Sequence, residues 1–146
     1  MNKTIKILLV EDNPGDVVLT KAAFKKADFD YELYIATDGE KALDFLAKSG
    51  DYTEAVTPDI ILLDLNLPRM DGFELLQQAK SMLNIKRIPV IILTSSEAEV
   101  DVVKTYDLYA NSYIVKPVNL EKFASIVQSL GDFWFNSCKL PGYIQN

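Results

Sequence analysis

The sequence predicts a single α/β domain in which helices cover both faces of a parallel β-sheet. Short apolar runs alternate with longer amphipathic stretches along the chain, and parallel strands need such helical crossovers to connect them. The run Ile60–Leu63 is apolar without interruption, which is typical of a strand buried on both faces. With 146 residues, 49% of them hydrophobic, the chain can form one such domain with a full core.

Five short runs have the composition of strands. The first is apolar and is closed by Glu11 and Asp12, whereas the second alternates like a strand near an edge of the sheet. The predicted strands are Ile5–Val10, Tyr31–Ala36, Ile60–Leu63, Ile88–Leu93 and Ser112–Val115.

Five amphipathic stretches between these runs are predicted to be helices. In the first, Val17, Ala23 and Phe24 fall on one side, and in the second Asp38 has the position of an N-cap. The connection Ser49–Thr57 is longer than most loops of this kind, so we expect it to be flexible. The predicted helices are Asp16–Lys26, Asp38–Lys48, Gly72–Leu83, Ala98–Tyr109 and Asn119–Leu130.

The composition excludes several function classes. A net charge of -6 without a basic run argues against nucleic-acid binding, and Ile5–Val10 is far too short to span a bilayer. The single cysteine, Cys138, cannot form an internal disulfide, which favours the reducing cytoplasm. Because the chain has no histidine, any phosphohistidine in its chemistry must belong to a partner.

Polar residues follow four of the predicted strands at the point where each strand ends. They are Glu11 and Asp12, Asp64, Thr94 to Ser96, and Lys116. Taken one at a time, these residues are ordinary caps and loop residues. Together they would meet at one edge of a parallel sheet, where ligands bind in such folds. Three carboxylates there need a neutralising cation, for which Mg²⁺ and the Lys116 ammonium are suited.

These strand ends resemble the signature of response-regulator receiver domains of two-component phosphorelays. The resemblance covers about residues 5–130 and preserves the order and the spacing of the motifs. It implies the flavodoxin-like (βα)5 fold, with strand order 2-1-3-4-5. The matching segments are Leu8 to Asp12, Leu63 to Gly72, Leu93 to Ser95 and Tyr113 to Pro117.

The resemblance implies a role for each acid. Asp64 would be the phosphoacceptor, which attacks a phosphohistidine and forms an aspartyl phosphate. Asp12 and Asp64 would bind Mg²⁺, for which Mn²⁺ could substitute, together with the backbone carbonyl of Asn66. Glu11 would help to hold the cation indirectly, without being one of its direct ligands.

The resemblance also assigns the phosphoryl-binding and switch residues. Lys116, the Thr94 hydroxyl and the Ser95 backbone would bind phosphoryl oxygens. Thr94 would move toward the phosphoryl group and let Tyr113 turn inward, as a two-state switch. The Lys116–Pro117 peptide bond would be cis, as in the family.

Two further segments resemble the receivers of cyanobacterial and bacterial phytochrome kinases. They are Asn13 to Asp16 and the tail Gly131 to Pro141. We therefore expect a receiver domain over residues 1–130, an aromatic extension over 131–146 and no output domain. The expected partner is a histidine kinase of the phytochrome type.

Clustered aromatic residues near the end of the chain predict a homodimer. Phe133, Trp134 and Phe135 cannot all point into one core, and exposed aromatic clusters are typical of protein interfaces. The alternative is a tail that folds back on its own domain. The candidate interface residues are Tyr106, Tyr109, Phe123, Phe133, Trp134 and Phe135.

Three other functions are weaker alternatives. A haloacid-dehalogenase-like phosphatase needs a second acid two residues after its nucleophile, where this chain has Asn66. A nucleotide-binding flavodoxin-like module would have a glycine-rich loop after the first strand, and none is present. A degenerate receiver that only binds partners would lack a residue of the signature, and none is missing. We expect no enzymatic activity beyond self-phosphorylation and autodephosphorylation.

Overall fold

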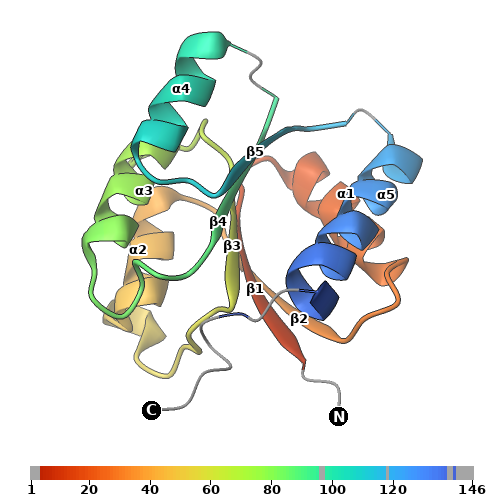
Figure 1. The fold of residues 1–146 in the computed structure, drawn as a ribbon. Helices are drawn as coiled ribbons and strands as arrows, with labels where there is room; N and C mark the ends of the chain where they lie inside the picture. Colours follow the sequence, from red (N-terminus) through yellow and green to blue (C-terminus); the bar gives the residue numbers. More distant parts are fainter. Residues whose placement is uncertain (1–3, 96–97, 118, 138–139, 141–146) are drawn as a thin grey trace.

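The computed structural model describes residues 4–95, 98–117, 119–137 and 140. These residues form five strands and five α-helices in strict alternation, with two short helical segments of other types (Figure 1). The elements are β1 Ile5–Val10, α1 Pro14–Lys25, β2 Tyr31–Ala36, α2 Gly39–Ala47, the 3-10 segment η1 Gly50–Tyr52, β3 Ile60–Leu63, α3 Gly72–Ser81, β4 Val90–Thr94, α4 Glu99–Asp107, β5 Ser112–Val115, α5 Leu120–Leu130 and the π-helical segment η2 Gly131–Ser137.

The strands form one parallel sheet in the order β2-β1-β3-β4-β5. Helices α1 and α5 cover one face of this sheet, and α2, α3 and α4 lie on the other (Figure 1). The predicted fold class and strand order are therefore confirmed. The chain order reverses direction between β1 and β3, which is where sheets of this type bind ligands.

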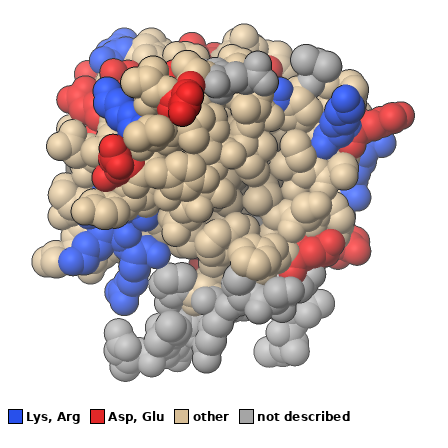
Figure 2. Space-filling view, turned by 45° about the horizontal axis from the view of Figure 1, so that its top comes forward, with Lys and Arg blue, Asp and Glu red and all other residues tan. Residues whose placement is uncertain are grey.

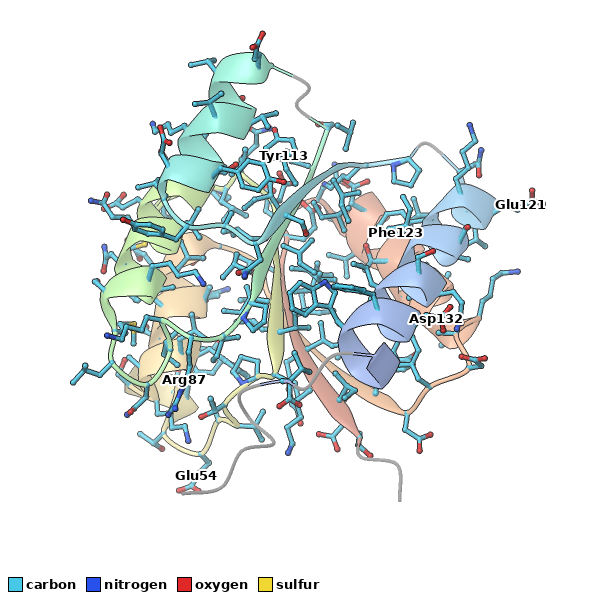
Figure 3. All side chains as sticks on the ribbon, viewed as in Figure 1. Glu54, Arg87, Tyr113, Glu121, Phe123 and Asp132 are labelled. Atoms are coloured by element: carbon cyan, nitrogen blue, oxygen red, sulfur yellow. The ribbon has the colours of Figure 1, made fainter. Side chains whose placement is uncertain are left out.

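The sheet separates two apolar clusters. In β1, Leu8 and Val10 belong to the cluster under α2 and α3, whereas Ile7 and Leu9 belong to the cluster under α1 and α5. Alternate residues of a strand point to opposite faces, so an uninterrupted apolar run is needed to fill both clusters. Phe123 of α5 is fully buried between its helix and the sheet (Figure 3).

Four α-helices begin at a side chain that caps the first turn. At α2, the Asp38 carboxylate accepts a hydrogen bond of 2.7 Å from the Lys41 N–H, as predicted for this residue. Such a cap satisfies a backbone donor that the helix itself cannot pair. The four capping residues are Asn13, Asp38, Asp71 and Asn119.

Some boundaries differ from the prediction for identifiable reasons. Helix α1 begins at Pro14, because proline is well tolerated in the first turn, where its missing N–H is not needed. Strand β4 begins at Val90 and not at Ile88, since Pro89 has no N–H to donate. The connection predicted to be flexible contains η1, where Tyr52 packs on Phe45 with ring centroids 5.7 Å apart.

The described residues after α5 are η2 and Leu140. Segment η2 extends the helix, Trp134 packs on the cluster under α1 and α5, and Leu140 is buried in that cluster. Phe133 is exposed. Within the described part of the chain, no helix combines the length and the apolar character that crossing a membrane requires.

Candidate functional site

The polar residues at the strand ends meet at one edge of the sheet. Glu11 directly follows β1, Asp64 directly follows β3 and Thr94 ends β4. Lys116 directly follows β5, and its N–H donates a hydrogen bond of 2.7 Å to the Thr94 carbonyl. Because β1, β3, β4 and β5 are neighbours in the sheet, these side chains converge.

The Lys116 ammonium is the centre of this cluster. Its Nζ donates to Glu11 Oε1, to Asp16 Oδ2 at 2.7 Å and to Asp64 Oδ2 at 2.8 Å. The side chains of Lys116 and Asp64 are each 8% exposed and that of Glu11 is 2% exposed, whereas that of Asp16 is 35% exposed. Burial of an ammonium requires such partners, and the three bonds use all three of its donors.

Asp64 is oriented through both of its oxygens. Oδ1 accepts hydrogen bonds from the Thr94 hydroxyl at 2.9 Å and from the Asn66 N–H at 3.1 Å, while Oδ2 binds Lys116. Burial alone would raise the pKa of Asp64, but the hydrogen bonds from Lys116, Glu11 and Asn66 outweigh it and hold the pKa below its ordinary value. Asp64 is therefore an ionised and rigidly held carboxylate.

Glu11 has the opposite electrostatic character. Burial raises its pKa to about 7, and the hydrogen bond from Lys116 offsets this only in part. For Lys116, burial acts to lower the pKa, but the bonds to Asp16, Asp64 and Glu11 outweigh burial and raise it. The site thus combines an ionised acid, a second acid that holds its proton near neutral pH, and a permanent cation.

The carboxylates also suit a divalent cation. Glu11, Asp16 and Asp64 each offer one oxygen, and these oxygens lie within 4.8 Å of one another. Hard divalent cations take oxygen ligands of this kind, so the donor set fits. Asp12, the ligand implied by the resemblance, is exposed and is not a member of this group. Glu11 is still paired as in the sheet, because its N–H donates to the Ala36 carbonyl. Successive residues of a strand point in opposite directions, which accounts for the separation of Asp12 from Glu11.

Comparison with known proteins decides the family. The sequence-family model of the response regulator receiver domain matches residues 7–128 of this chain. The chain belongs to this family. It is a response regulator of two-component signalling, and the prediction of a receiver is confirmed.

The receiver is similar to cyanobacterial response regulators over nearly its whole length. It is 43% identical to the response regulator Rcp1 of Synechocystis sp. over 135 residues, which are 92% of each chain. A crystal structure of the Mn²⁺-bound form of Rcp1 has a TM-score of 0.86 at 42% identity and covers 94% of this chain and 99% of that one. The structure of the phosphorylated cyanobacterial phytochrome response regulator RcpA has a TM-score of 0.90 at 42% identity and covers 95% and 99%.

The structure brings together most of the residues predicted for the receiver's site. Glu11, Asp64, Thr94 and Lys116 are in direct contact, and Asn66 contacts Asp64 through its N–H. Two further predicted residues lie on or directly after the neighbouring strands. Ser95 is exposed directly after β4, and Tyr113 of β5 is half-buried against the cluster on the α2–α4 side (Figure 3). Their roles stay predictions.

Two predictions about this receiver are wrong. The Lys116–Pro117 bond is trans, because the described residues contain no cis peptide bond. A cis and a trans bond before proline differ by only about 1 kcal/mol, and the lysine is already directed by three carboxylates. Phe123 cannot be an interface residue, because it is 1% exposed within the domain's own core.

The residue missed by the sequence prediction is Asp16. It lies in the first turn of α1, close after the strand-end acids, and this proximity was the available signal. An acid in that position is also a common favourable partner of the helix dipole, so the sequence did not single it out.

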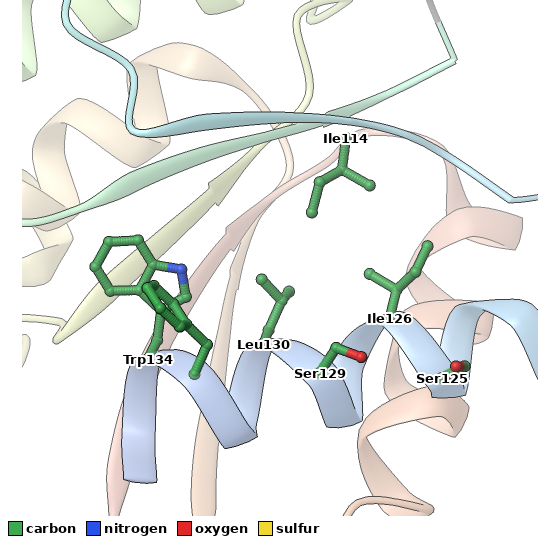
Figure 4. A pocket seen from close by; sticks show the side chains of 7 residues that line it. Ile114, Ser125, Ile126, Ser129, Leu130 and Trp134 are labelled. Carbon is green, nitrogen blue, oxygen red and sulfur yellow. The ribbon is translucent and has the colours of Figure 1, made fainter. Parts of the chain in front are cut away.

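The remaining interface candidates differ in exposure. Tyr106, Tyr109 and Phe133 are exposed, Trp134 is half-buried, and the Phe135 side chain, like Ser96 and Cys138, lies outside the described residues. Phe133 and Trp134 line a groove of about 300 Å³ between β5 and the α5–η2 helix (Figure 4). Its lining is mostly apolar and consists of Ile114, Ser125, Ile126, Ser129, Leu130, Phe133 and Trp134.

Figure 2 shows the face that comes forward when the top of the molecule in Figure 1 is turned toward the viewer, and charged residues do not cover this face. In Figure 2 they lie mainly around the rim of that face, and uncharged residues form most of its centre. Such a surface leaves room for apolar contacts with another protein.

Proposed function

We propose that this receiver accepts a phosphoryl group on Asp64 from the phosphohistidine of a sensor kinase. The observation that carries the proposal is the setting of Asp64, an ionised carboxylate that is held by Thr94, Asn66 and Lys116 at the active edge of the sheet. A nucleophile needs an ionised form and a fixed direction, and both are present here.

In the proposed transfer, an Asp64 oxygen forms a bond to phosphorus while the P–N bond of the phosphohistidine breaks. The electron pair of that bond returns to the imidazole of the kinase. Lys116 and the Thr94 hydroxyl, which now contact Asp64, would donate to the phosphoryl oxygens.

A divalent cation, Mg²⁺ or alternatively Mn²⁺, would supply further neutralisation of phosphoryl charge when bound. Glu11 and Asp64 belong to the carboxylate group that fits it. We propose Asp12 and the Asn66 carbonyl, at the same strand ends, as further ligands.

Thr94 and Tyr113 are the proposed switch. The Thr94 hydroxyl binds Asp64 before phosphorylation, and Tyr113 is half-buried on the neighbouring strand. A change of Thr94 toward a phosphoryl oxygen would alter the space beside Tyr113 and thereby the surface near α4.

Intact mass after incubation with acetyl phosphate and Mg²⁺ tests the phosphoacceptor. Wild type and the control Asp51→Asn, an exposed acid in η1, should gain one phosphoryl group. Asp64→Asn should gain none. A wild type that stays unmodified would contradict the proposal, and so would an Asp64→Asn protein that is modified.

We further propose that the phosphoryl donor is a phytochrome-type histidine kinase and that the protein acts in the cytoplasm without catalysing reactions on other substrates. The similarity to RcpA, whose name identifies it as a phytochrome response regulator, supports this partner. A phosphotransfer profile against a panel of histidine kinases tests it. Transfer that is fastest from a kinase of another type would rule out the phytochrome assignment.

Homodimerisation is the proposed role of the exposed apolar surface of α4, β5 and η2. This surface includes Val100, Val103, Tyr106, Tyr109 and Phe133, and the groove of Figure 4 adjoins it. Exposed aromatic side chains beside an apolar groove are typical of interface cores.

Light scattering at high micromolar concentration tests the dimer. Phe133→Glu should leave a folded monomer, because the ring is exposed and its loss leaves the core intact. Leu83→Glu, at another exposed apolar residue, should dimerise like wild type. A wild type that is monomeric both before and after phosphorylation would refute the dimer.

A further inference from the structure

Asp16 contacts the functional lysine although it does not lie at a strand end. It belongs to the first turn of α1, and its Oδ2 accepts a hydrogen bond of 2.7 Å from Lys116 Nζ. The contact joins residues 100 positions apart in the sequence, so it exists only in the assembled site.

The start of α1 holds the backbone of Asp16 from both sides. Its N–H donates to the Asn13 side chain at 3.0 Å, and its carbonyl accepts from the buried Thr20 hydroxyl at 2.7 Å. Pro14 fixes the backbone of the first helical position. The segment Asn13 to Asp16 therefore presents the carboxylate to Lys116 in a defined position.

Lys116 has no spare donor for a phosphoryl oxygen. An ammonium carries three N–H groups, and here they are used by Glu11, Asp16 and Asp64. One of the three carboxylates must give up its bond before Lys116 can bind a phosphoryl group.

Of the three hydrogen bonds of Lys116, the one to Asp16 costs least to break. The Glu11 side chain is 2% exposed, so loss of the lysine would leave its buried oxygen without this hydrogen-bond donor. Asp64 keeps its bond to the ammonium until its oxygen has bonded to phosphorus, so the first contact of Lys116 with the incoming group needs the donor of another carboxylate. The Asp16 side chain is 35% exposed and lies at a helix N-terminus, so water and the helix dipole stabilise its charge after release.

We propose that Asp16 is a positioning residue that occupies one donor of Lys116 in the unphosphorylated receiver and yields it to a phosphoryl oxygen on activation. The inference rests on the proposed function of Asp64. Asp16 thereby competes with the phosphoryl group for the lysine and sets how readily the receiver is activated.

The test measures binding of beryllofluoride, a phosphoryl analogue, at saturating Mg²⁺ by ¹⁹F NMR. Asp16→Asn removes the competing charge, so beryllofluoride should bind up to about fivefold more tightly, the upper end of the range for a partly exposed ion pair. Asp16→Glu keeps the charge and should return the affinity toward that of wild type, and the control Asp51→Asn should match wild type.

Three outcomes separate the possibilities. Unchanged or weaker beryllofluoride binding by an Asp16→Asn protein that unfolds at the same urea concentration as wild type would overturn the inference. Weaker Mg²⁺ binding by this variant in calorimetry, without tighter beryllofluoride binding, would also overturn it and assign Asp16 to the cation. A wild type that neither binds beryllofluoride nor becomes phosphorylated would instead contradict the proposed function.

Discussion

Glu11 and Asp64 bind the same ammonium, yet their pKa values are shifted in opposite directions. Burial dominates at Glu11 and raises its pKa to about 7, whereas at Asp64 the bonds from Lys116, Glu11 and Asn66 outweigh burial and lower it. The hydrogen bond between the two acids contributes to this difference, because it raises the pKa of Glu11 and lowers that of Asp64, and Asp64 also accepts from the Asn66 N–H. Two acids in one cluster can therefore differ in protonation near neutral pH.

The raised pKa of Glu11 predicts a specific pH dependence of stability. Between about pH 5 and 7 the folded protein retains a proton that the unfolded chain has lost, so stability falls as the pH rises. Relative to Glu11→Gln, the free energy of unfolding of wild type should drop by roughly 3 kcal/mol from pH 5 to 8. Urea denaturation in EDTA at several pH values measures it.

Glu54→Gln is the matched control, because Glu54 is exposed and lies far from the site (Figure 3). Its profile should follow that of wild type. Parallel profiles for wild type and Glu11→Gln would show that Glu11 has an ordinary pKa.

Removal of the lysine charge should destabilise the resting site. In Lys116→Met the three carboxylates lose their common partner, and breaking a buried ion pair costs roughly 3 kcal/mol. Mg²⁺ should stabilise this variant more than wild type, since the cation and the lysine neutralise the same carboxylates. Thermal unfolding with Mg²⁺ or with EDTA measures both effects.

Lys122→Met, at an exposed lysine of α5, should behave like wild type in both buffers. If Mg²⁺ stabilised Lys116→Met and wild type equally, the lysine and the cation would not neutralise the same carboxylates.

At the residue scale, the sequence predicted what strand ends alone determine. Asp64 and Lys116 follow apolar runs, and parallel strands bring such ends together. The part played by Asp16 was not predictable, because its contact depends on how far α1 stands from β5. The trans bond at Pro117 was not predictable either, because cis and trans forms differ little in energy.

At the scale of elements, two glycines hold the segment between β3 and α3 against its neighbours. A Cβ on Gly39 would lie 2.1 Å from the Met70 carbonyl oxygen, and one on Gly72 would lie 2.6 Å from the Asp64 carbonyl oxygen. Both obstacles are backbone atoms, which cannot turn aside as a side chain can. These close backbone contacts hold the loop between β3 and α3, which contains the residues directly after Asp64, in one position.

Gly72→Ala should therefore lower both the stability of the protein and its rate of phosphorylation. The clash with the Asp64 backbone should lower the free energy of unfolding by about 1–3 kcal/mol and slow phosphorylation by acetyl phosphate. Gln77→Ala, on the exposed side of α3, should change neither. Urea titration and the rate of mass gain measure the two effects, and a Gly72→Ala protein with the stability of wild type would refute the argument.

The sequence predicted the type of every strand and α-helix among the described residues, and the predicted bounds of β1, β2, β3 and β5 agree with the observed ones. Apolar runs determine such strands locally. The last regular helix was predicted to end at Leu130, and the structure continues it as η2, although glycine commonly follows a helix end. Here Gly131 serves close packing instead, since a Cβ would lie 2.2 Å from the Phe29 ring.

At the scale of the whole molecule, the two apolar clusters are closed by segments far apart in the chain. Leu140 is 1% exposed and completes the cluster formed by the sheet, α1 and α5. The family match ends at residue 128, so this contact is an addition to the common receiver core. Leu140 thus packs on its own domain, whereas Phe133 is exposed.

Leu140→Ala should destabilise the protein as a core substitution does, by about 2–4 kcal/mol. Leu83→Ala is the matched control, because Leu83 is 80% exposed and should lose little. Chemical denaturation of both variants measures the difference. Equal stability of the two variants would show that Leu140 is not part of the folded core.

The lysine-centred cluster also has a consequence for the order of folding. Lys116 is separated by 105 residues from Glu11 and by 52 from Asp64, so the acids have no counter-charge until β5 docks. Contacts of such long sequence separation form late and slow folding. The acids repel one another until then, and added salt screens this repulsion. We expect refolding after dilution from urea to accelerate with rising salt, and a stopped-flow rate that is independent of salt would contradict this order of events.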